Sequence, residues 1–191
     1  MSPVEKIGSP ILRRRRVPLS FTDIRRPSFR FFLKKMVSAM RAHHGVGIAA
    51  NQLGRPCQAL AMECRANQRY PGRGPFSLEI LINPRVIKAS KKLVTDWEGC
   101  LSIPGYRAKV PRAARITYTA LTDQARPVLR TVTGFKARVL QHEMDHLNGL
   151  FYLYRVKDLC SLMHWEVYNR RVVIQKRIHG EKGVYERKKS R

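Results

Sequence analysis

The 191-residue chain has few acidic residues and no long apolar run. It holds 13 Asp and Glu against 38 Lys and Arg, which gives a formal charge of +25. No stretch approaches the roughly 18 consecutive apolar residues of a membrane-spanning helix. The opening sequence MSPVEKIGSP lacks the apolar core of a secretory signal. We therefore expect a protein that neither crosses a membrane nor is secreted.

Cysteine is also scarce. The four cysteines, Cys57, Cys64, Cys100 and Cys160, are widely spaced and form no CxxC pair. This spacing argues against a disulfide framework and favours a reducing compartment. The Arg-rich run 13–16 is read as an exposed basic segment, with the remnant of an organellar address as the alternative.

The excess of positive charge predicts attraction to polyanions, chiefly nucleic acid. A basic bias shared by a whole proteome would give the same composition. The sequence contains no recognised nucleic-acid module and no stacking pattern of the RRM type. The charge therefore indicates where the protein sits and not what it catalyses.

Two helices are indicated by apolar residues at helical spacing. The first spans 28–44 and would end at Gly45. The second spans 135–148, with Gly149 at the position of a C-terminal cap. A third helix is predicted over 157–174.

Strands are predicted between the first two helices, at 57–62, 79–84, 92–103, 115–121 and 128–133. The last two are expected to pair across the turn TDQARP. GVGIAANQLG is read as a Gly-rich turn that enters a strand. This order predicts a single α+β domain over residues 1–175, followed by a mobile basic tail at 176–191.

The stretch LQHEMDHLNG carries the clearest chemical signal. His142 and His146 are four residues apart, so a helix places both imidazoles on one face, where they can share a metal ion. Glu143 lies beside the first histidine, where a general base for a metal-activated water is useful. The alternative is a helix that merely bears two surface histidines.

Two histidines need a third protein ligand. One class of zinc proteases uses a third histidine, but that position here is Tyr152, so the class is excluded. Another class uses a glutamate on the following helix, and Glu166 lies at a suitable spacing. The remaining option is Cys100, whose thiolate would suit Zn²⁺ or Fe²⁺ and whose neighbour Gly99 allows a close backbone approach. The residues alone leave Glu166 and Cys100 open.

Three stretches occur together in order: GVGIAANQ at 45–52, EGCLS at 98–102 and QHEMDH at 141–146. In this combination the chain resembles the peptide deformylases of bacterial type. The resemblance covers roughly residues 5–168 and extends to GSPILR, LINP, IPGYRAKVPRA and GFKARV. It implies an α+β fold of antiparallel sheets packed around a central helix that carries HExxH, with helices near both ends.

The resemblance also implies the chemistry. Cys100, His142 and His146 would bind one divalent metal, with water as the fourth ligand. Fe²⁺ would be the physiological ion, and Zn²⁺, Ni²⁺ or Co²⁺ would be able to replace it. The reaction would remove the formyl group from the initiator methionine of nascent polypeptides and release formate. Glu143 would shuttle the proton.

Further roles follow from the same resemblance. The Gln52 side chain and the backbone N–H of Leu101 would stabilise the oxyanion. The candidate substrate-binding residues are Val46, Gly47, Gly99, Phe135, Val139 and Arg107. Core packing is the alternative for Phe135 and Val139, and a solvated basic loop is the alternative for Arg107.

The chain departs from the family pattern at peripheral positions. Asn51 stands where Pro or Thr is more usual, and Tyr154 replaces a common acidic residue. Neither departure is expected to touch a metal ligand. Lys and Arg are unusually abundant, and the basic tail is not part of the pattern.

The expected partners are formyl-methionyl nascent peptides and, through the basic surface, the ribosome and its RNA. We expect a cytoplasmic monomer, with a mitochondrion or another organelle as the alternative compartment. Two other functions stay open. One is a different HExxH metallopeptidase with Glu166 as third ligand, and the other is an inactive ribosome- or RNA-binding homologue.

Overall fold

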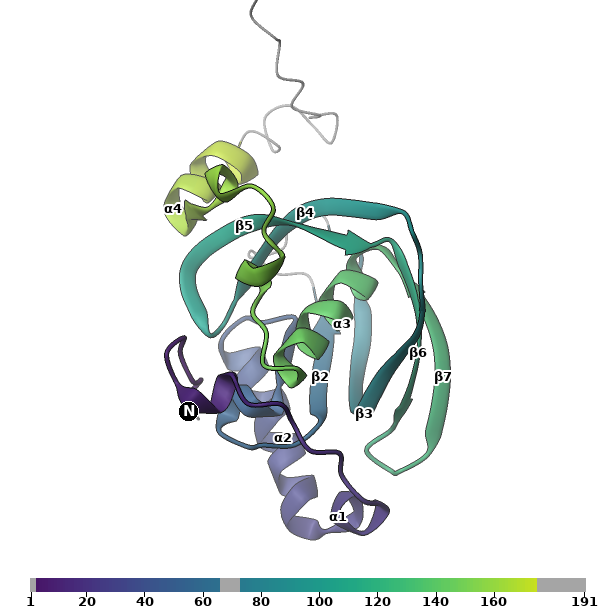
Figure 1. Cartoon of the computed structure of the whole chain (residues 1–191). Helices are drawn as coiled ribbons and strands as arrows, with labels where there is room; N and C mark the ends of the chain where they lie inside the picture. The colour runs from purple at the N-terminus through teal and green to yellow at the C-terminus, as the bar shows by residue number, and fades with distance from the viewer. Residues whose placement is uncertain (1–2, 66–72, 175–191) are drawn as a thin grey trace, which may run out of the picture.

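Helix α3, Gly134–Leu147, runs between two antiparallel sheets (Figure 1). This computed structural model describes residues 3–65 and 73–174. Antiparallel sheets with a few helices were predicted, and that prediction is confirmed. The predicted basic tail at 176–191 lies outside the described residues.

The larger sheet has five strands in the order β1-β2-β3-β6-β7. Their bounds are β1 Gly47–Ala49, β2 Ala59–Cys64, β3 Phe76–Ala89, β6 Arg115–Leu121 and β7 Pro127–Thr133. Along β6 the alternate residues Ile116, Tyr118 and Ala120 are buried, because successive side chains of a strand point to opposite faces. β6 pairs with β7 as predicted.

The smaller sheet has the order β4-β5-β8, with β4 Leu93–Cys100, β5 Ile103–Ala113 and β8 Met163–His164. β5 was not predicted as a strand, because Pro104, Gly105 and Pro111 argue against one. β8 pairs only with Tyr106 and Arg107, so the other edge of β5 is unpaired at Pro111 among the described strands. The missing N–H of Pro111 can face this unpaired edge, so the pairing of β5 with β4 is kept.

The N-terminal helices are α1, Phe21–Arg25, and α2, Pro27–Ala42. α2 matches the first predicted helix and begins at Pro27, whose missing N–H and fixed φ suit the first turn. Its buried face packs against β1 and β2. Each large apolar side chain that this face fully buries contributes roughly 2 kcal/mol to folding.

Short 3-10 helices connect these elements at Pro10–Leu12, Ala50–Leu53, Tyr152–Arg155 and Leu159–Ser161. The stretch GVGIAANQLG therefore enters strand β1 first and turns afterwards, the reverse of the predicted order. α3 ends as predicted before Gly149, which has φ +75°. A Cβ at Gly149 would lie 2.3 Å from the backbone oxygen of Arg13, so only glycine fits there.

The third predicted helix, over 157–174, begins too early. α4 spans only Trp165–Tyr168 and continues as a π-helix at Asn169–Ile174. Asp158 instead caps a 3-10 turn by accepting a hydrogen bond from the backbone N–H of Cys160. Met163 and His164 then pair with β5, a long-range contact that helical spacing cannot reveal.

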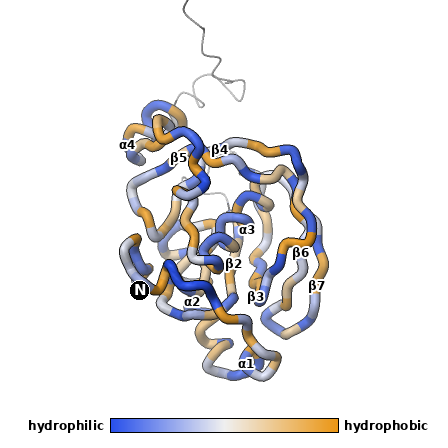
Figure 2. The backbone as a smooth tube through the Cα atoms, in the orientation of Figure 1, coloured by the Kyte–Doolittle hydropathy of each residue, from blue (hydrophilic) through white to orange (hydrophobic). Residues whose placement is uncertain are grey.

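Hydrophilic stretches of α3 lie at the centre of the fold (Figure 2). Arg138, His142, Glu143, Asp145 and His146 are all buried on this helix. Burying such groups is costly unless they find partners, so their concentration marks a site. None of the described helices is long and apolar enough to cross a membrane.

Candidate metal centre

The ligand atoms of Cys100, His142 and His146 all lie within 4.8 Å of one another, and all three residues are buried. The histidines are one turn apart on α3, and Cys100 is the last residue of β4. The Cys100 Sγ is 3.1 Å from the His146 Nε2. Helix and strand thus bring together the three ligands that the family resemblance implies.

The Cys100 thiol lies in an environment that favours the thiolate. Burial alone would raise the pKa of Cys100, but His146 and His142 beside the sulfur outweigh it and hold this pKa well below its usual range. The backbone N–H of Ser102 also points at the Sγ, at 3.4 Å. Since the thiolate is the form that binds metals, the environment of Cys100 suits a ligand.

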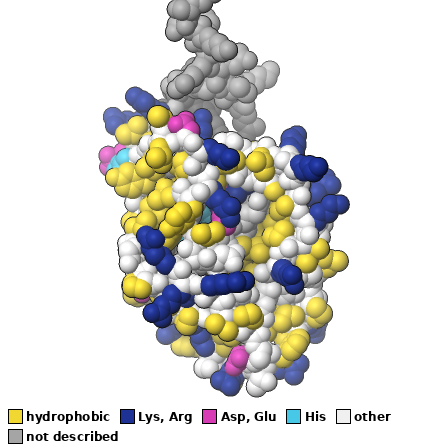
Figure 3. Space-filling view, in the orientation of Figure 1, with side chains coloured by type: hydrophobic (Ala, Val, Ile, Leu, Met, Phe, Trp, Pro, Cys, Tyr) yellow, Lys and Arg dark blue, Asp and Glu magenta, His cyan; other side chains and the backbone are white. Residues whose placement is uncertain are grey.

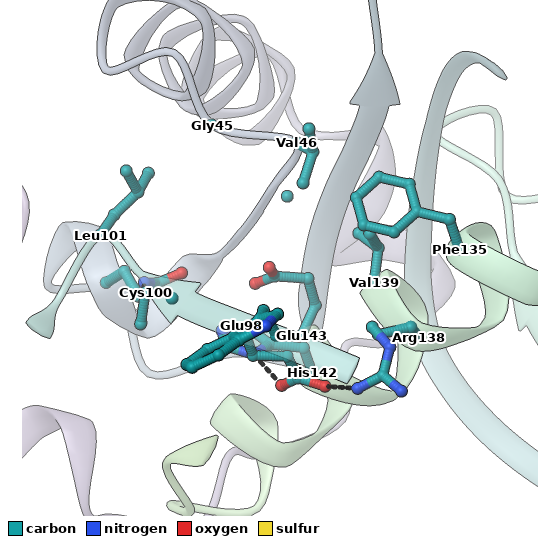
Figure 4. Close-up of a pocket in the computed structure, with 14 residues that line it drawn as sticks. Gly45, Val46, Glu98, Cys100, Leu101, Phe135, Arg138, Val139, His142 and Glu143 are labelled. Atoms are coloured by element: carbon teal, nitrogen blue, oxygen red, sulfur yellow. Dashed lines mark hydrogen bonds and ion pairs between the residues drawn. The ribbon is translucent and has the colours of Figure 1, made fainter. Parts of the chain in front are cut away.

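Glu98 orients the first histidine. Its carboxylate contacts the His142 Nδ1 at 2.8 Å, accepts two hydrogen bonds of 2.9 Å from Arg112 and accepts one of 2.7 Å from Arg138. Figure 4 shows Glu98 between His142 and Arg138. Burial would raise the pKa of Glu98, but Arg112 and His142 hold it well below its usual range. With Nδ1 engaged, the Nε2 of His142 faces the cluster.

Gln52 approaches the cluster from the other side. Its Oε1 accepts a hydrogen bond of 2.8 Å from the backbone N–H of Ala49. This contact turns the Nε2 toward the Cys100 Sγ, at 3.6 Å, and the Ser102 Oγ, at 3.0 Å. The side-chain amide therefore presents its N–H groups to the metal cluster.

Glu143 points into the pocket beside Cys100 and Leu101 (Figure 4). Burial raises the pKa of Glu143 to about 7. Its Oε2 is buried and has no hydrogen-bond partner among the described residues. A Cβ on Gly47 would lie 2.3 Å from the Glu143 Oε1, so glycine is required for the close approach of β1.

These observations fit a divalent metal. One sulfur and two imidazole nitrogens form a donor set typical of Zn²⁺ or Fe²⁺ sites. The unpaired Glu143 oxygen next to them suits a carboxylate that handles a proton of water.

A pocket opens at the cluster, and its lining is apolar in one part and polar in another. Among the predicted site residues it is lined by Val46, Gly47, Gln52, Gly99, Cys100, Leu101, Phe135, Val139, His142 and Glu143. In Figure 4, Phe135 and Val139 from α3 lie on the same side of the pocket as Val46. Sequence reasoning did not name as site residues Gly45, Trp97, Glu98 and Arg138, which also line it. Gly45, Glu98 and Arg138 lie in the quoted stretches GVGIAANQ, EGCLS and GFKARV, and Trp97 directly precedes EGCLS, so these stretches were the available signal.

Comparison with known proteins decides the family. The family model "Polypeptide deformylase" matches residues 1–161. This chain belongs to the peptide deformylase family. It is 41% identical over 161 residues to peptide deformylase 1 of Nitrosomonas europaea. This match covers 83% of this chain and 89% of the relative. It is 37% identical to peptide deformylase 2 of Ralstonia nicotianae, over 86% of this chain and 92% of that protein.

Solved structures agree. A class I type b peptide deformylase from Acinetobacter baumannii superposes with a TM-score of 0.79 at 34% identity, covering 82% of this chain and all of that one (100%). The enzyme from Thermotoga maritima gives a TM-score of 0.71 at 29% identity, over 83% and 99% of the two chains. The protein is thus a hydrolase that removes the N-formyl group from nascent peptides. Peptide deformylases are metalloenzymes, and the Cys/His/His cluster is the candidate metal site in this chain.

The metallopeptidase alternative with Glu166 is not supported. The Glu166 side chain is 77% exposed, and its carboxylate lies 3.9 Å from the His164 Nδ1. It does not belong to the Cys100 cluster. The 3-10 turn Leu159–Ser161 and strand β8 come before α4. They place Glu166 outside the cluster, although its distance along the sequence suited a third ligand.

Arg107 lies apart from the other predicted substrate residues. It does not line the pocket but the neighbouring groove. Its guanidinium carbon lies 4.7 Å from the ring centre of Trp165 and 5.0 Å from that of Tyr168. Cation–π contacts with α4 therefore hold this side chain, which is buried on β5, so the alternative of a solvated loop is not supported. Its contact with the peptide stays a prediction.

One expectation about the departures was wrong. The Asn51 side chain donates a hydrogen bond of 2.8 Å to the backbone oxygen of His146, one of the candidate ligands. It thereby joins the turn after β1 to the end of α3. Tyr154 lies outside the cluster and accepts a hydrogen bond of 2.9 Å from Arg13.

We predict that Glu98→Gln weakens metal binding about 10-fold to 100-fold, because partners that orient a ligating histidine typically contribute this much. It should also lower the stability, since Arg112 and Arg138 lose their buried countercharge. The measurements are metal affinity by chelator competition and thermal unfolding.

The matched control for Glu98→Gln is Glu79→Gln. Glu79 accepts hydrogen bonds from Tyr118, Arg130 and Lys136 but lies in the larger sheet, outside the cluster. It should lose stability with little change in metal affinity. Equal metal affinity in Glu98→Gln and the unchanged chain would show that Glu98 does not orient His142.

Proposed function

We propose that Cys100, His142 and His146 hold one divalent ion, Fe²⁺ in the cell, and that formyl hydrolysis takes place beside it. The observation that carries this proposal is the convergence of the three ligand atoms within 4.8 Å next to the unpaired Glu143 carboxylate. When bound, the ion supplies Lewis acidity, which lowers the pKa of the attacking water and polarises the formyl carbonyl. The preference for Fe²⁺ rests on the family resemblance, and Zn²⁺, Ni²⁺ or Co²⁺ suit the same donors.

Glu143 acts as general base and then as general acid. It accepts the proton of the attacking water and delivers it to the methionine nitrogen as the C–N bond breaks, so that formate and a free amine result. Burial, which raises the pKa of Glu143 to about 7, supports proton exchange in both directions near neutral pH.

Gln52 and Leu101 stabilise the oxyanion that forms on the formyl carbon. The Gln52 Nε2 is oriented through the contact of its Oε1 with Ala49, and the Leu101 N–H follows directly after the ligand Cys100. One such donor contributes about 3 kcal/mol to transition-state stability. Because Ala49 fixes the amide beforehand, little reorganisation is needed during the reaction.

The peptide lies between the two sheets. β1 and β4 are edge strands of their respective sheets, and both border the pocket, so an extended peptide can pair with either edge. Gly47 and Gly99 leave room for its backbone. The methionine side chain enters the pocket and packs against Phe135 and Val139. The Acinetobacter relative was solved with Met-Ala-Ser bound, which supports peptide binding in this fold.

We also infer that residues 1–175 form one catalytic domain that works in the cytoplasm. The family match over residues 1–161 supports the single domain. All four cysteines are free, which suits a reducing compartment.

The test is formate release from formyl-Met-Ala-Ser by protein purified anaerobically. We expect Glu143→Gln to lower kcat at least about 100-fold while the metal is retained, because only the proton shuttle is lost. Glu166→Gln, on an exposed carboxylate, is the control and should keep both activity and metal. Full activity of Glu143→Gln would overturn the mechanism. Metal analysis of the same preparation tests the ion, since zinc in place of iron would refute the choice of Fe²⁺.

We further propose that the basic surface docks on ribosomal RNA near the emerging chain. The support is the charge of +25 and the Lys and Arg side chains spread over the face in Figure 3. Binding to ribosomes should weaken steeply as salt is raised, because RNA contacts release counterions. Co-sedimentation at several salt concentrations measures this. Binding that is absent at low salt, or indifferent to salt, would contradict the proposal.

A further inference from the structure

A second hollow adjoins the metal pocket on the side of Leu101. We call it the basic groove; its basic lining residues are Lys6, His43, His44 and Arg107. We propose that the basic groove selects formyl-methionyl peptides that carry an acidic residue at the second or third position. This inference rests on the proposed function, because it requires the peptide to be bound for deformylation.

The basic groove continues the metal pocket. Cys100 and Leu101 line both hollows, so the two meet at the end of β4. Another hollow lies on the other side of α3 and shares no lining residue with the pocket. With the methionine side chain in the pocket, the residues that follow it leave past Leu101 and through the basic groove.

Lys6 stands at the junction of the two hollows. Its Nζ donates a hydrogen bond of 3.0 Å to the backbone oxygen of Leu101, and the residue is exposed. This contact holds an ammonium group beside the residue whose N–H we assign to the oxyanion. The remaining hydrogens of the Nζ can bind a carboxylate on the passing peptide.

The other walls supply a second positive charge, that of Arg107, and two imidazoles. His43 and His44 follow α2 on one side, and His44 has φ +52°, which turns the chain there. Across the groove, the cation–π contacts with Trp165 and Tyr168 hold the Arg107 guanidinium in a fixed position. No Asp or Glu is present among the described residues that line the groove.

The expected selectivity is moderate. An exposed ion pair contributes about 0.2–1 kcal/mol, which corresponds to at most about a fivefold change in kcat/KM. The effect should act through KM, because the acidic side chain contacts the groove and not the reacting atoms. It should also fade at high salt, since the ammonium group of Lys6 is solvent-exposed.

The experiment compares kcat/KM for formate release by the metal-loaded full chain. The substrates are formyl-Met-Ala-Ser, formyl-Met-Asp-Ser, formyl-Met-Ala-Asp and formyl-Met-Lys-Ser, all with amidated C-termini. We expect one or both Asp peptides to exceed the Ala peptide about threefold to fivefold, and the Lys peptide to fall below it. The quantity that matters is the ratio of the Asp to the Ala peptide, because a general loss of activity cancels in it.

Substitution of Lys6 locates the effect. Lys6→Glu should lower the Asp-to-Ala ratio to one or below, and Lys6→Arg should preserve it. The matched control is Lys88→Glu, which changes the net charge equally on an exposed residue of β3 outside both hollows. It should retain the ratio of the unchanged chain.

Each contrary result has a distinct meaning. Equal kcat/KM for all peptides overturns the selectivity while leaving the deformylase function intact. Equal loss of the ratio in Lys6→Glu and Lys88→Glu assigns the effect to overall charge and overturns the role of the groove. Absence of formate from every peptide refutes the proposed function and this inference with it.

Discussion

One buried carboxylate, Glu98, joins the smaller sheet to the central helix beside the candidate metal centre. It accepts hydrogen bonds from Arg112 on β5 and Arg138 on α3, and it orients His142. Removing one member of such a buried ionic group leaves an uncompensated charge and typically costs about 3–5 kcal/mol. Glu98 therefore holds the smaller sheet and the central helix in one relative position, and the same carboxylate orients the His142 ring.

The placement of the Cys100 sulfur follows from the strand that carries Glu98. Glu98 and Cys100 are two residues apart on β4, and both are buried, because alternate side chains of a strand share a face. That face meets α3, where His142 and His146 share the opposing side. Strand periodicity and helix periodicity thus bring a sulfur and two imidazoles together. Arg112 extends the network by a further ion pair to Asp145.

Local patterns made much of this predictable. The spacing of His142 and His146 reports a helix face, and the three motifs together imply Cys100 as the third ligand. Long-range contacts were not visible in the same way. β5 is a strand despite two prolines because β4 pairs with it, and the cation–π contacts of Arg107 depend on α4 folding back against β5. Trp97 lies in none of the quoted stretches, and Arg138 lies in GFKARV, but the contact of Arg138 with Glu98 depends on the tertiary arrangement.

The most direct test of the metal centre is X-ray absorption at the edge of the ion in protein loaded under anaerobic conditions. Loading with Zn²⁺ should give one sulfur at about 2.3 Å and two imidazole nitrogens at about 2.0–2.1 Å. The sulfur should disappear in Cys100→Ala, whereas Cys57→Ala should retain it. A coordination shell of nitrogen and oxygen alone in the unchanged chain would contradict the account.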